Sequence, residues 1–462
     1  MGLLRLFDRE RCIAPPGFSR WRVPPAALAI HLAIGQAYAF SVFNLPLSHA
    51  IGITKDAPGD WKLSTIGWVF SLAIVFLGLS AFTFGRWLEA AGPRKAMFAS
   101  AACFASGFFV SAVGVNTHQI WLIYLGYGVI GGIGLGLGYI SPVSTLIKWF
   151  PDRPGMATGL AIMGFGGGAM IGSPLAVSLM DHFKTPTSTG VAATFVAMGA
   201  IYFVFMMFGV FTVRLPAPGW APSAASSRAA DAASRVHPPA PDVHVDRALS
   251  TKQFWLLWVV LCFNVTAGIG VLGQASPMIQ EMFAGRISAA AAAGFVGLLS
   301  LANMAGRFMW SSFSDVIGRR ATYMIFFALG AVLYAAVPTT GRIGSVALFV
   351  VSYAVIMTMY GGGFATIPAY LRDLFGIMHV GAIHGRLLTA WSVAGVAGPS
   401  LVNYIREYQL AHGVAKADAY SVTMYLMAAL LVVGFIANWL VTPVDSRFRF
   451  TPDPATAART AA

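Results

Sequence analysis

Long uncharged stretches of apolar residues dominate this chain. Of its 462 residues, 57% are hydrophobic and only 10% are charged, whereas soluble domains carry about 25% charged residues. Apolar stretches of roughly 18 or more residues are typical of helices that span a bilayer. A β-barrel would show alternating polarity instead, and only helices or closed barrels satisfy their backbone in lipid. The sequence therefore predicts an all-α membrane protein.

We expect twelve transmembrane helices. They lie at about 25–47, 63–84, 96–115, 119–146, 155–180, 191–213, 253–276, 289–313, 322–338, 344–369, 384–404 and 419–442. The first apolar stretch is long enough to span a bilayer, so we expect no cleavable signal peptide before it. The lipid bilayer is the first partner that this pattern implies.

The basic residues indicate the orientation of the chain. The net charge is +13, but the lysines and arginines lie between apolar stretches and form no nucleic-acid motif, so we expect no nucleic-acid partner. With both termini in the cytoplasm, cytoplasmic segments hold 22 of the 30 basic residues and external loops hold seven. By the positive-inside rule, we expect a multi-pass protein of a bacterial inner membrane with both termini cytoplasmic.

Residues 214–252 differ from the rest of the chain because they are rich in alanine, proline and serine. Such a composition is typical of a flexible linker without a core of its own. The predicted organisation is a cytoplasmic N-terminal segment, a first six-helix bundle, a cytoplasmic linker, a second six-helix bundle and a cytoplasmic tail. These occupy residues 1–24, 25–213, 214–252, 253–442 and 443–462.

The two halves carry related motifs at equal spacing. Glu89 and Gly92 follow the second apolar stretch, and Asp315 and Gly318 follow the eighth, with the same separation along the chain in both cases. Pro142 and Pro368, at the ends of stretches four and ten, are separated by that same offset. Two six-helix repeats are typical of secondary transporters, which hold their substrate near the midplane at the repeat interface.

An acidic residue, a glycine and a basic pair in the loops after stretches two and eight resemble the signature loop of the major facilitator superfamily. More specific strings are similar to the oxalate/formate antiporter family, which is close to the monocarboxylate transporters. These strings are Ile34–Tyr38, Gly138–Pro142, Gly164–Gly168, Asn303–Arg307 and Tyr360–Phe364. The resemblance covers nearly all of the chain outside the linker and termini. It implies the major facilitator fold and transport by alternating access.

Arg307 is the most informative single residue. It lies six residues before the predicted helix end at Phe313, which is about 9 Å of depth. A charge at that depth must face protein or water, and no predicted span holds a carboxylate to pair with it. An unpaired guanidinium matches a carboxylate in bidentate geometry, and the resemblance implies the same role. The alternative is that Arg307 reaches the cytoplasmic surface or pairs with Asp315.

Several polar residues accompany Arg307 as candidate substrate contacts. Asn303 lies one helical turn earlier on the same face and either binds the anion, orients the guanidinium or simply joins helices. The resemblance implies substrate contacts for Tyr139, Tyr360, Gln36 and Tyr38, for which ordinary packing is the alternative interpretation.

Trp391 occupies the place at which oxalate-type members of the resembled family carry a lysine. Beyond Arg386 in its first turn, the eleventh stretch holds no lysine or arginine. One cation suits a monoanion, because charge balance dominates in a site of low dielectric constant. We therefore expect a small monocarboxylate such as formate, lactate or pyruvate, carried by proton symport or anion exchange. An oxalate:formate-type dicarboxylate antiporter and a non-transporting carboxylate sensor are the alternatives.

The remaining candidates concern coupling and gating. His31 is the one further ionisable side chain, tyrosines and cysteines aside, that the predicted spans place well inside the membrane. It is either a proton site or a neutral hydrogen-bonded group. Glu89 and Asp315 are predicted to act as gating latches with neighbouring arginines, Arg94 and Arg319.

No nucleophile–base pair and no metal-ligand spacing is visible, including at Cys12, Cys103 and Cys262. We therefore expect no enzymatic activity, no metal and no cofactor. The expected partners are a small organic anion and, for symport, protons. The protein is expected to be a monomer.

Overall fold

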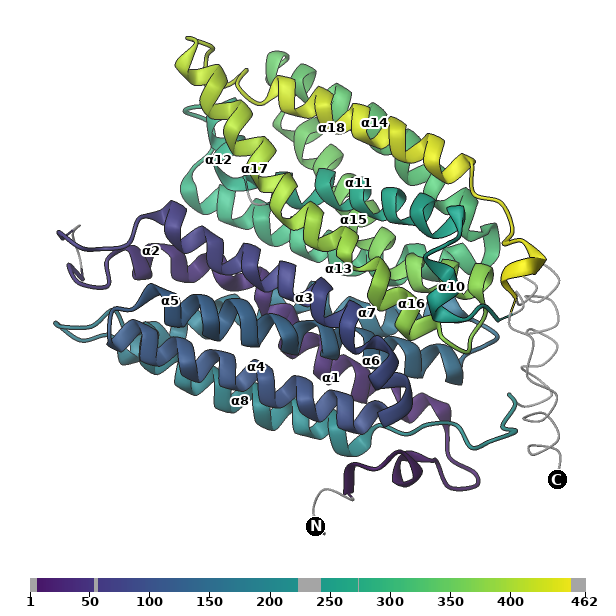
Figure 1. Ribbon diagram of the computed structural model, residues 1–462. Helices are drawn as coiled ribbons and strands as arrows, with labels where there is room; N and C mark the ends of the chain where they lie inside the picture. The colour runs from purple at the N-terminus through teal and green to yellow at the C-terminus, as the bar shows by residue number, and fades with distance from the viewer. Residues whose placement is uncertain (1–5, 54–56, 223–241, 273, 450–462) are drawn as a thin grey trace.

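The computed structural model describes residues 6–53, 57–222, 242–272 and 274–449. Its described part consists almost wholly of helices (Figure 1). The centre of the predicted linker, residues 223–241, and the end of the predicted tail, from residue 450, lie outside the described residues.

The first half contains six membrane-crossing stretches. They are α1 (Pro24–Ile34) continued by η4 (Gly35–Phe43) and α2 (Asn44–Ser48), α3 (Leu63–Ala91), α4 (Pro93–Asn116), α5 (Ile120–Ile123) continued by η5 (Tyr124–Gly131) and α6 (Gly132–Trp149), α7 (Pro154–Phe183) and α8 (Val191–Thr212).

The second half contains six more, preceded by the short helix α10 (Val245–Ala248). They are α11 (Lys252–Leu272) with α12 (Ala275–Met282), α13 (Ala289–Ile317), α14 (Arg319–Arg342), α15 (Val346–Phe375), α16 (Val380–Leu387) with α17 (Thr389–Ala411), and α18 (Ser421–Trp439). Among the described residues, ten helices are long and apolar enough to cross a membrane by length and composition. The α13 and α16–α17 stretches complete the twelve transmembrane helices of the fold.

The two halves are pseudo-repeats of each other. Helices α3, α4 and α5–α6 span 63–91, 93–116 and 120–149, and helices α13, α14 and α15 span 289–317, 319–342 and 346–375, so one constant offset relates every boundary to its counterpart. The contacts between the halves follow the same symmetry. Helix α7 packs on α13 and α15, and its counterpart α16–α17 packs on α3 and α6. The internal repeat predicted from the sequence motifs is confirmed.

The helices are longer than predicted on one side of the bundle. Helix α3 ends at Ala91 and α13 at Ile317, so most of each predicted signature loop is helical. Only Gly92 and Gly318 break the chain there, with φ angles of 87° and 93° that suit glycine because it lacks a Cβ atom. The extra turns are held by close packing, since Gly85 of α3 lies against the backbone of Ala382.

Both ends of the described chain lie on one side of the bundle. Ala14 donates a backbone hydrogen bond to Leu215 after α8, Arg20 pairs with Asp152 before α7, and Val243 bridges to Arg449. We call this side, formed by residues 6–23, 150–153, 242–249 and 443–449, the termini face. The loop residues 49–53, 57–62 and 184–190 mark the opposite face.

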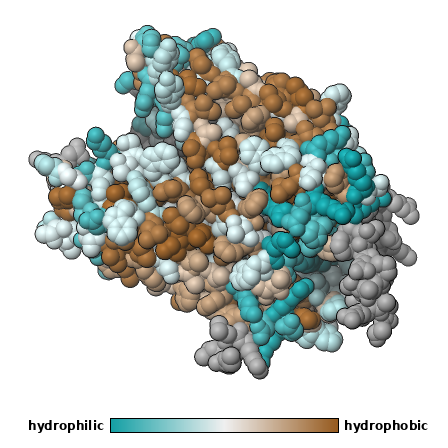
Figure 2. All heavy atoms as spheres, viewed as in Figure 1, coloured by the Kyte–Doolittle hydropathy of each residue, from teal (hydrophilic) through white to brown (hydrophobic). Residues whose placement is uncertain are grey.

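The flanks of the bundle are apolar. Large exposed hydrophobic residues occur along the outer helices, among them Val204 and Phe208 of α8 and Val332 of α14. Figure 2 shows hydrophobic residues over the flank that carries α14 and α18, and hydrophilic residues gathered near α10. A broad exposed apolar surface of this kind is expected where lipid replaces water. The protein is a multi-pass membrane protein.

Candidate functional site

Arg307 lies deep in α13, between the two halves. The helix runs to Ile317 rather than to Phe313, so Arg307 is ten residues from its end, which is about 15 Å. Its side chain is 0% exposed. Small residues allow this position, because Gly166 of α7 lies against the guanidinium: a Cβ there would be 3.0 Å from its Nε.

The guanidinium is only partly satisfied by its neighbours. Its Nε donates to Asn303 Oδ1 at 3.0 Å, and one Nη donates to the carbonyl oxygen of Ile162 in α7 at 3.4 Å. The other, Nη2, has no hydrogen-bond partner within the described residues. Asp315, the alternative partner considered from the sequence, instead pairs with Arg319. Asn303 therefore orients the arginine and leaves one donor available.

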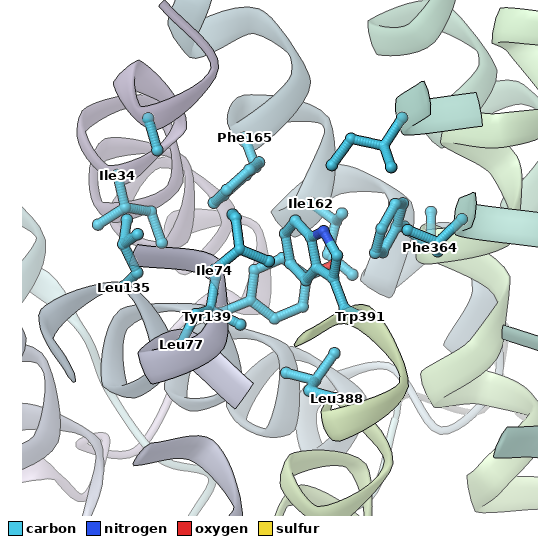
Figure 3. Packing of buried hydrophobic residues seen from close by; sticks show 14 of the residues in the cluster. Ile34, Ile74, Leu77, Leu135, Tyr139, Ile162, Phe165, Phe364, Leu388 and Trp391 are labelled. Carbon is cyan, nitrogen blue, oxygen red and sulfur yellow. The ribbon is translucent and has the colours of Figure 1, made fainter. Parts of the chain in front are cut away.

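Aromatic rings enclose Arg307. The centre of its guanidinium lies 5.1 Å from the Phe364 ring and 5.7 Å from the Phe165 ring. The Trp391 ring centroid is 4.5 Å from that of Phe364 and 5.3 Å from those of Phe165 and Tyr139. Figure 3 shows the Trp391 indole between Tyr139 and Phe364. We call Phe165, Phe364, Trp391, Tyr139 and Tyr38 the aromatic cage. It excludes water, which strengthens any ionic contact inside it.

Further polar atoms of the cage lack partners. Within the part of the chain that the structure describes, Tyr139 Oη and Trp391 Nε1 make no hydrogen bond although both are buried. Buried donors are rarely left unpaired, because each loses about 1–3 kcal/mol. Together with Arg307 Nη2 they are hydrogen-bond donors from both halves with no acceptor to receive them. Such a set of donors can bind an anion.

His31 lies beside Tyr139 at the edge of the cage. Its Nδ1 is 3.2 Å from the carbonyl oxygen of Ala27, and since a carbonyl only accepts, Nδ1 is the donor in this contact. The opposite nitrogen, Nε2, is buried with no partner among described residues. The His31 and Tyr139 ring centroids are 5.4 Å apart.

The other predicted substrate contacts divide into two groups. The hydroxyl groups of Tyr38 and Tyr360 are 3.1 Å apart, so Tyr360 of α15 is bridged to Tyr38 of the cage, which lies on η4. Gln36 instead accepts a hydrogen bond from Tyr127 at 2.8 Å and lies beside Gly172, within the first half. The geometry does not bring Gln36 to Arg307.

His384 and the two phenylalanines of the cage were missed from the sequence. The predicted eleventh span begins at His384, which left His31 as the one histidine expected deep in the membrane. That prediction was wrong: His384 is 1% exposed and lies inside α16. The repeat offset that relates Glu89 to Asp315 could have located it, because the same offset aligns His384 with Thr158 inside α7.

The predicted gating residues lie at the termini face. Asp315 accepts hydrogen bonds from the backbone nitrogens of Gly155 and Met156, 2.9 Å each, and Arg319 also bonds Asp373 at 3.1 Å. Both Asp315 contacts to α7 cross between the halves.

The partner of Glu89 differs from the expected arginine. The Glu89 carboxylate accepts hydrogen bonds from the Lys148 ammonium group at 3.0 Å and from the backbone nitrogen of Gly381 at 3.1 Å. Arg94 instead donates to the carbonyl oxygens of Val210 and Phe211. Those carbonyls end α8, and the C-terminal end of a helix attracts a cation, which is why Arg94 turns away from Glu89.

All hydrogen bonds between described residues of the two bundles lie from mid-depth to the termini face. The deepest are the Tyr38–Tyr360 pair, the Arg307–Ile162 contact and the two bonds that Ser392 donates to α3, at 3.1 Å each. The halves are therefore fastened on the side of the termini face and not, among these residues, on the opposite side.

A polytopic membrane protein of two related six-helix halves, with a central site between them, has the architecture of a secondary transporter. The sequence of residues 26–399 matches the Major Facilitator Superfamily. The chain belongs to that family. Its family and relatives are those of a transporter and not of an enzyme.

Two similar proteins have informative descriptions. The oxalate:formate antiporter of Oxalobacter formigenes is 26% identical over 81% of this chain and 82% of its own length. Apicoplast pyruvate carrier 1 of Toxoplasma gondii is 24% identical over 71% of this chain and 68% of its own. Among solved structures, the transporter FucP in its outward conformation superposes with a TM-score of 0.61 over 92% of this chain and 100% of FucP, at 14% identity. That likeness concerns the fold alone.

Proposed function

We propose that this transporter carries a small monocarboxylate, of the size of formate, lactate or pyruvate, by alternating access around Arg307. The observation that carries the proposal is the buried Nη2 of Arg307, which has no partner among the described residues. A carboxylate fits there because it accepts from the guanidinium and from a neighbouring donor at once. Tyr139 Oη and Trp391 Nε1 are the neighbouring donors.

The charge of the site favours a monoanion. Arg307 is the cation that the cage encloses, and Trp391 offers a neutral donor where a second cation would be needed for a dianion. A second uncompensated carboxylate in a dry site would cost several kcal/mol. The similarity to a pyruvate carrier supports a monocarboxylate, whereas the similarity to an oxalate:formate antiporter supports oxalate exchange as the second candidate.

The contacts between the halves support the transport step. The bonds at the termini face keep the site closed on that side, and breaking them would let the halves separate there. We propose that Asp315 and Arg319, with Glu89 and Lys148, form this latch. The excess of basic residues on this side supports a cytoplasmic position for it by the positive-inside rule, and we propose that the membrane is a bacterial inner membrane.

The test is exchange and uptake of radiolabelled lactate, formate and oxalate in proteoliposomes. The parent protein is compared with Arg307→Gln and with Arg406→Gln. Arg406 is a suitable control because it lies in the same half but pairs with Glu281 away from the cage. We expect saturable lactate or formate exchange that Arg307→Gln abolishes and Arg406→Gln retains.

Two outcomes would change the proposal. If oxalate is exchanged well and the monocarboxylates are not, the dicarboxylate candidate is correct. If none of the three anions moves, or if Arg307→Gln transports like the parent, the carboxylate assignment is wrong.

A further inference from the structure

His384 is a second buried imidazole that the proposed anion site does not use. It lies on α16, four residues before the break at Leu388 that separates α16 from α17. It is 1% exposed, and neither ring nitrogen has a hydrogen-bond partner among described residues. An imidazole with two unsatisfied nitrogens in a dry interface is costly. Such a group is expected to gain a partner in another state of the protein.

Tyr139 connects His384 to the anion site. The ring centroids of Tyr139 and His384 are 5.8 Å apart, and those of Tyr139 and His31 are 5.4 Å apart. The Tyr139 ring thus lies beside a histidine of the first half and a histidine of the second. Tyr139 also contacts Trp391 of the cage, at 5.3 Å.

Few ionisable groups surround His384. Six elements pack against α16: α3, α6, α10, α11, α15 and α17. At the level of His384, α3 presents Ala81 and Gly85, which contact Gly385 and Ala382, and α6 presents Tyr139.

The charged groups of these elements lie nearer the ends of the bundle. Those toward the termini face are Arg86 and Glu89 of α3, Lys148 of α6, Asp246 and Arg247 of α10, Lys252 of α11, Arg372 and Asp373 of α15, and Arg386 of α16 itself. Those toward the opposite face are Arg406 and Glu407 of α17. Two further groups at the level of the cage can carry a positive charge, namely His31, when protonated, and Arg307.

This environment makes proton binding depend on the anion. A protonated His384 would be repelled by Arg307 across the dry cage. A carboxylate bound at Arg307 removes that repulsion, and by linkage a proton on His384 then raises the affinity for the carboxylate by the same factor.

We propose that His384 binds the proton that accompanies the anion, so that the transporter is a proton symporter rather than a pure exchanger. This rests on the proposed function. The proton forms an N–H bond with the ring nitrogen that carries no hydrogen. It leaves from the ring to water when the halves separate.

The position of His384 suits release at the termini face. Tyr139, which lies beside the His384 ring, and Ala81, which packs on the neighbouring Gly385, belong to the first half, whereas His384 belongs to the second. Separation of the halves on that side therefore opens His384 to water. While that side is closed, Tyr139 lies between His384 and Trp391 of the cage.

The experiment uses full-length protein in proteoliposomes with radiolabelled lactate outside and pyranine, a pH indicator, inside. Lactate exchange is measured with the same pH inside and outside the vesicles. Net lactate uptake is measured with the lumen one pH unit more alkaline than the outside. The variants are His384→Gln, His31→Gln and the control His412→Gln, whose exposed ring bonds only its own helical turn. For one proton per lactate, one pH unit supports up to about tenfold accumulation.

We expect the parent, His31→Gln and His412→Gln to accumulate lactate and to acidify the lumen. His384→Gln is expected to keep exchange at equal pH and to lose both accumulation and acidification. The inference is overturned, with the proposed function intact, if His384→Gln accumulates lactate like the parent or if the parent exchanges lactate without gradient-driven uptake. A parent that moves neither lactate nor formate defeats both.

If His384→Gln also loses lactate exchange, the affinity for lactate is measured in detergent at several pH values for the parent and for the variant. If His384 is the proton site, the affinity of the parent for lactate falls as pH rises. The affinity of the variant stays, at every pH, as weak as that of the parent at high pH. A variant whose affinity falls with pH as steeply as that of the parent would contradict the proposal.

Discussion

Asp315 caps a helix that belongs to the other half of the protein. Its two oxygens accept the backbone nitrogens of Gly155 and Met156, at 2.9 Å each. These nitrogens lie in the first turn of α7, whose own N-cap residue, Arg153, provides no side-chain hydrogen bond. A carboxylate at a helix N-terminus is stabilised by the free backbone donors and by the helix dipole. The contact exists only while the termini face is closed.

Asp315→Asn keeps the shape of the side chain but removes its charge and one acceptor oxygen. A hydrogen bond to a charged group contributes about 1.5–3 kcal/mol, and the helix dipole adds about 0.3–1 kcal/mol. The Asp315 side chain is only 12% exposed, so solvent screens these terms weakly. We expect the closed state to lose about 2 kcal/mol relative to the open state, which changes their ratio roughly thirtyfold.

The assay is a distance measurement between spin labels on the two halves by electron–electron double resonance. Labels at Ala90 and Ala321, both exposed near the termini face, report opening there, with the three native cysteines replaced by serine. The matched control is Asp152→Asn, which breaks a similarly buried pair with Arg20 inside the first half. We expect a longer-distance population for Asp315→Asn only. An unchanged distribution, or an equal shift with Asp152→Asn, would refute the role of Asp315.

Three further substitutions test the interface and the cage. Gly159→Leu places a side chain against the carbonyl oxygen of Arg307, which a Cβ atom alone would approach to 2.9 Å. The same spin labels should then report opening of the termini face. Unchanged label distances would argue against close packing at Gly159. Tyr139→Phe removes a hydroxyl group that has no partner among the described residues. The free energy of unfolding should therefore change by less than about 0.5 kcal/mol, while the affinity for lactate falls roughly two- to tenfold. A lactate affinity equal to that of the parent would exclude the hydroxyl from the site. Trp391→Lys adds a second cation, and the ratio of oxalate to lactate exchange should rise; an unchanged ratio would contradict the charge-balance argument.

The architecture could be predicted because it rests on periodic, local features. The apolar stretches define the spans, and the constant offset between the motifs of the two halves correctly predicted pairs of helices with the same offset. Helix ends at the termini face were predicted too short, because hydropathy falls before the helix does. At Glu89 the chain is already polar, but packing of Gly85 on Ala382 continues α3 to Ala91.

The central site was only partly predictable. Arg307 was singled out because a charge in an apolar stretch has few explanations, but its depth was underestimated because α13 continues to Ile317. The aromatic cage was not predicted, because Phe165 and Phe364 resemble any other apolar residue in the sequence until folding brings α7, α15 and α17 together. His384 was missed because it lies near Arg386, whose charge made the start of α16 resemble a loop.

Direct binding tests the central claim that Arg307 holds a carboxylate. Equilibrium dialysis of radiolabelled lactate and formate against purified parent, Arg307→Gln and Arg406→Gln measures affinity without the transport cycle. Loss of two charge-assisted hydrogen bonds of about 1.5 kcal/mol or more each predicts at least about hundredfold weaker binding for Arg307→Gln, with Arg406→Gln close to the parent. Binding of either anion to Arg307→Gln with parental affinity would contradict the account.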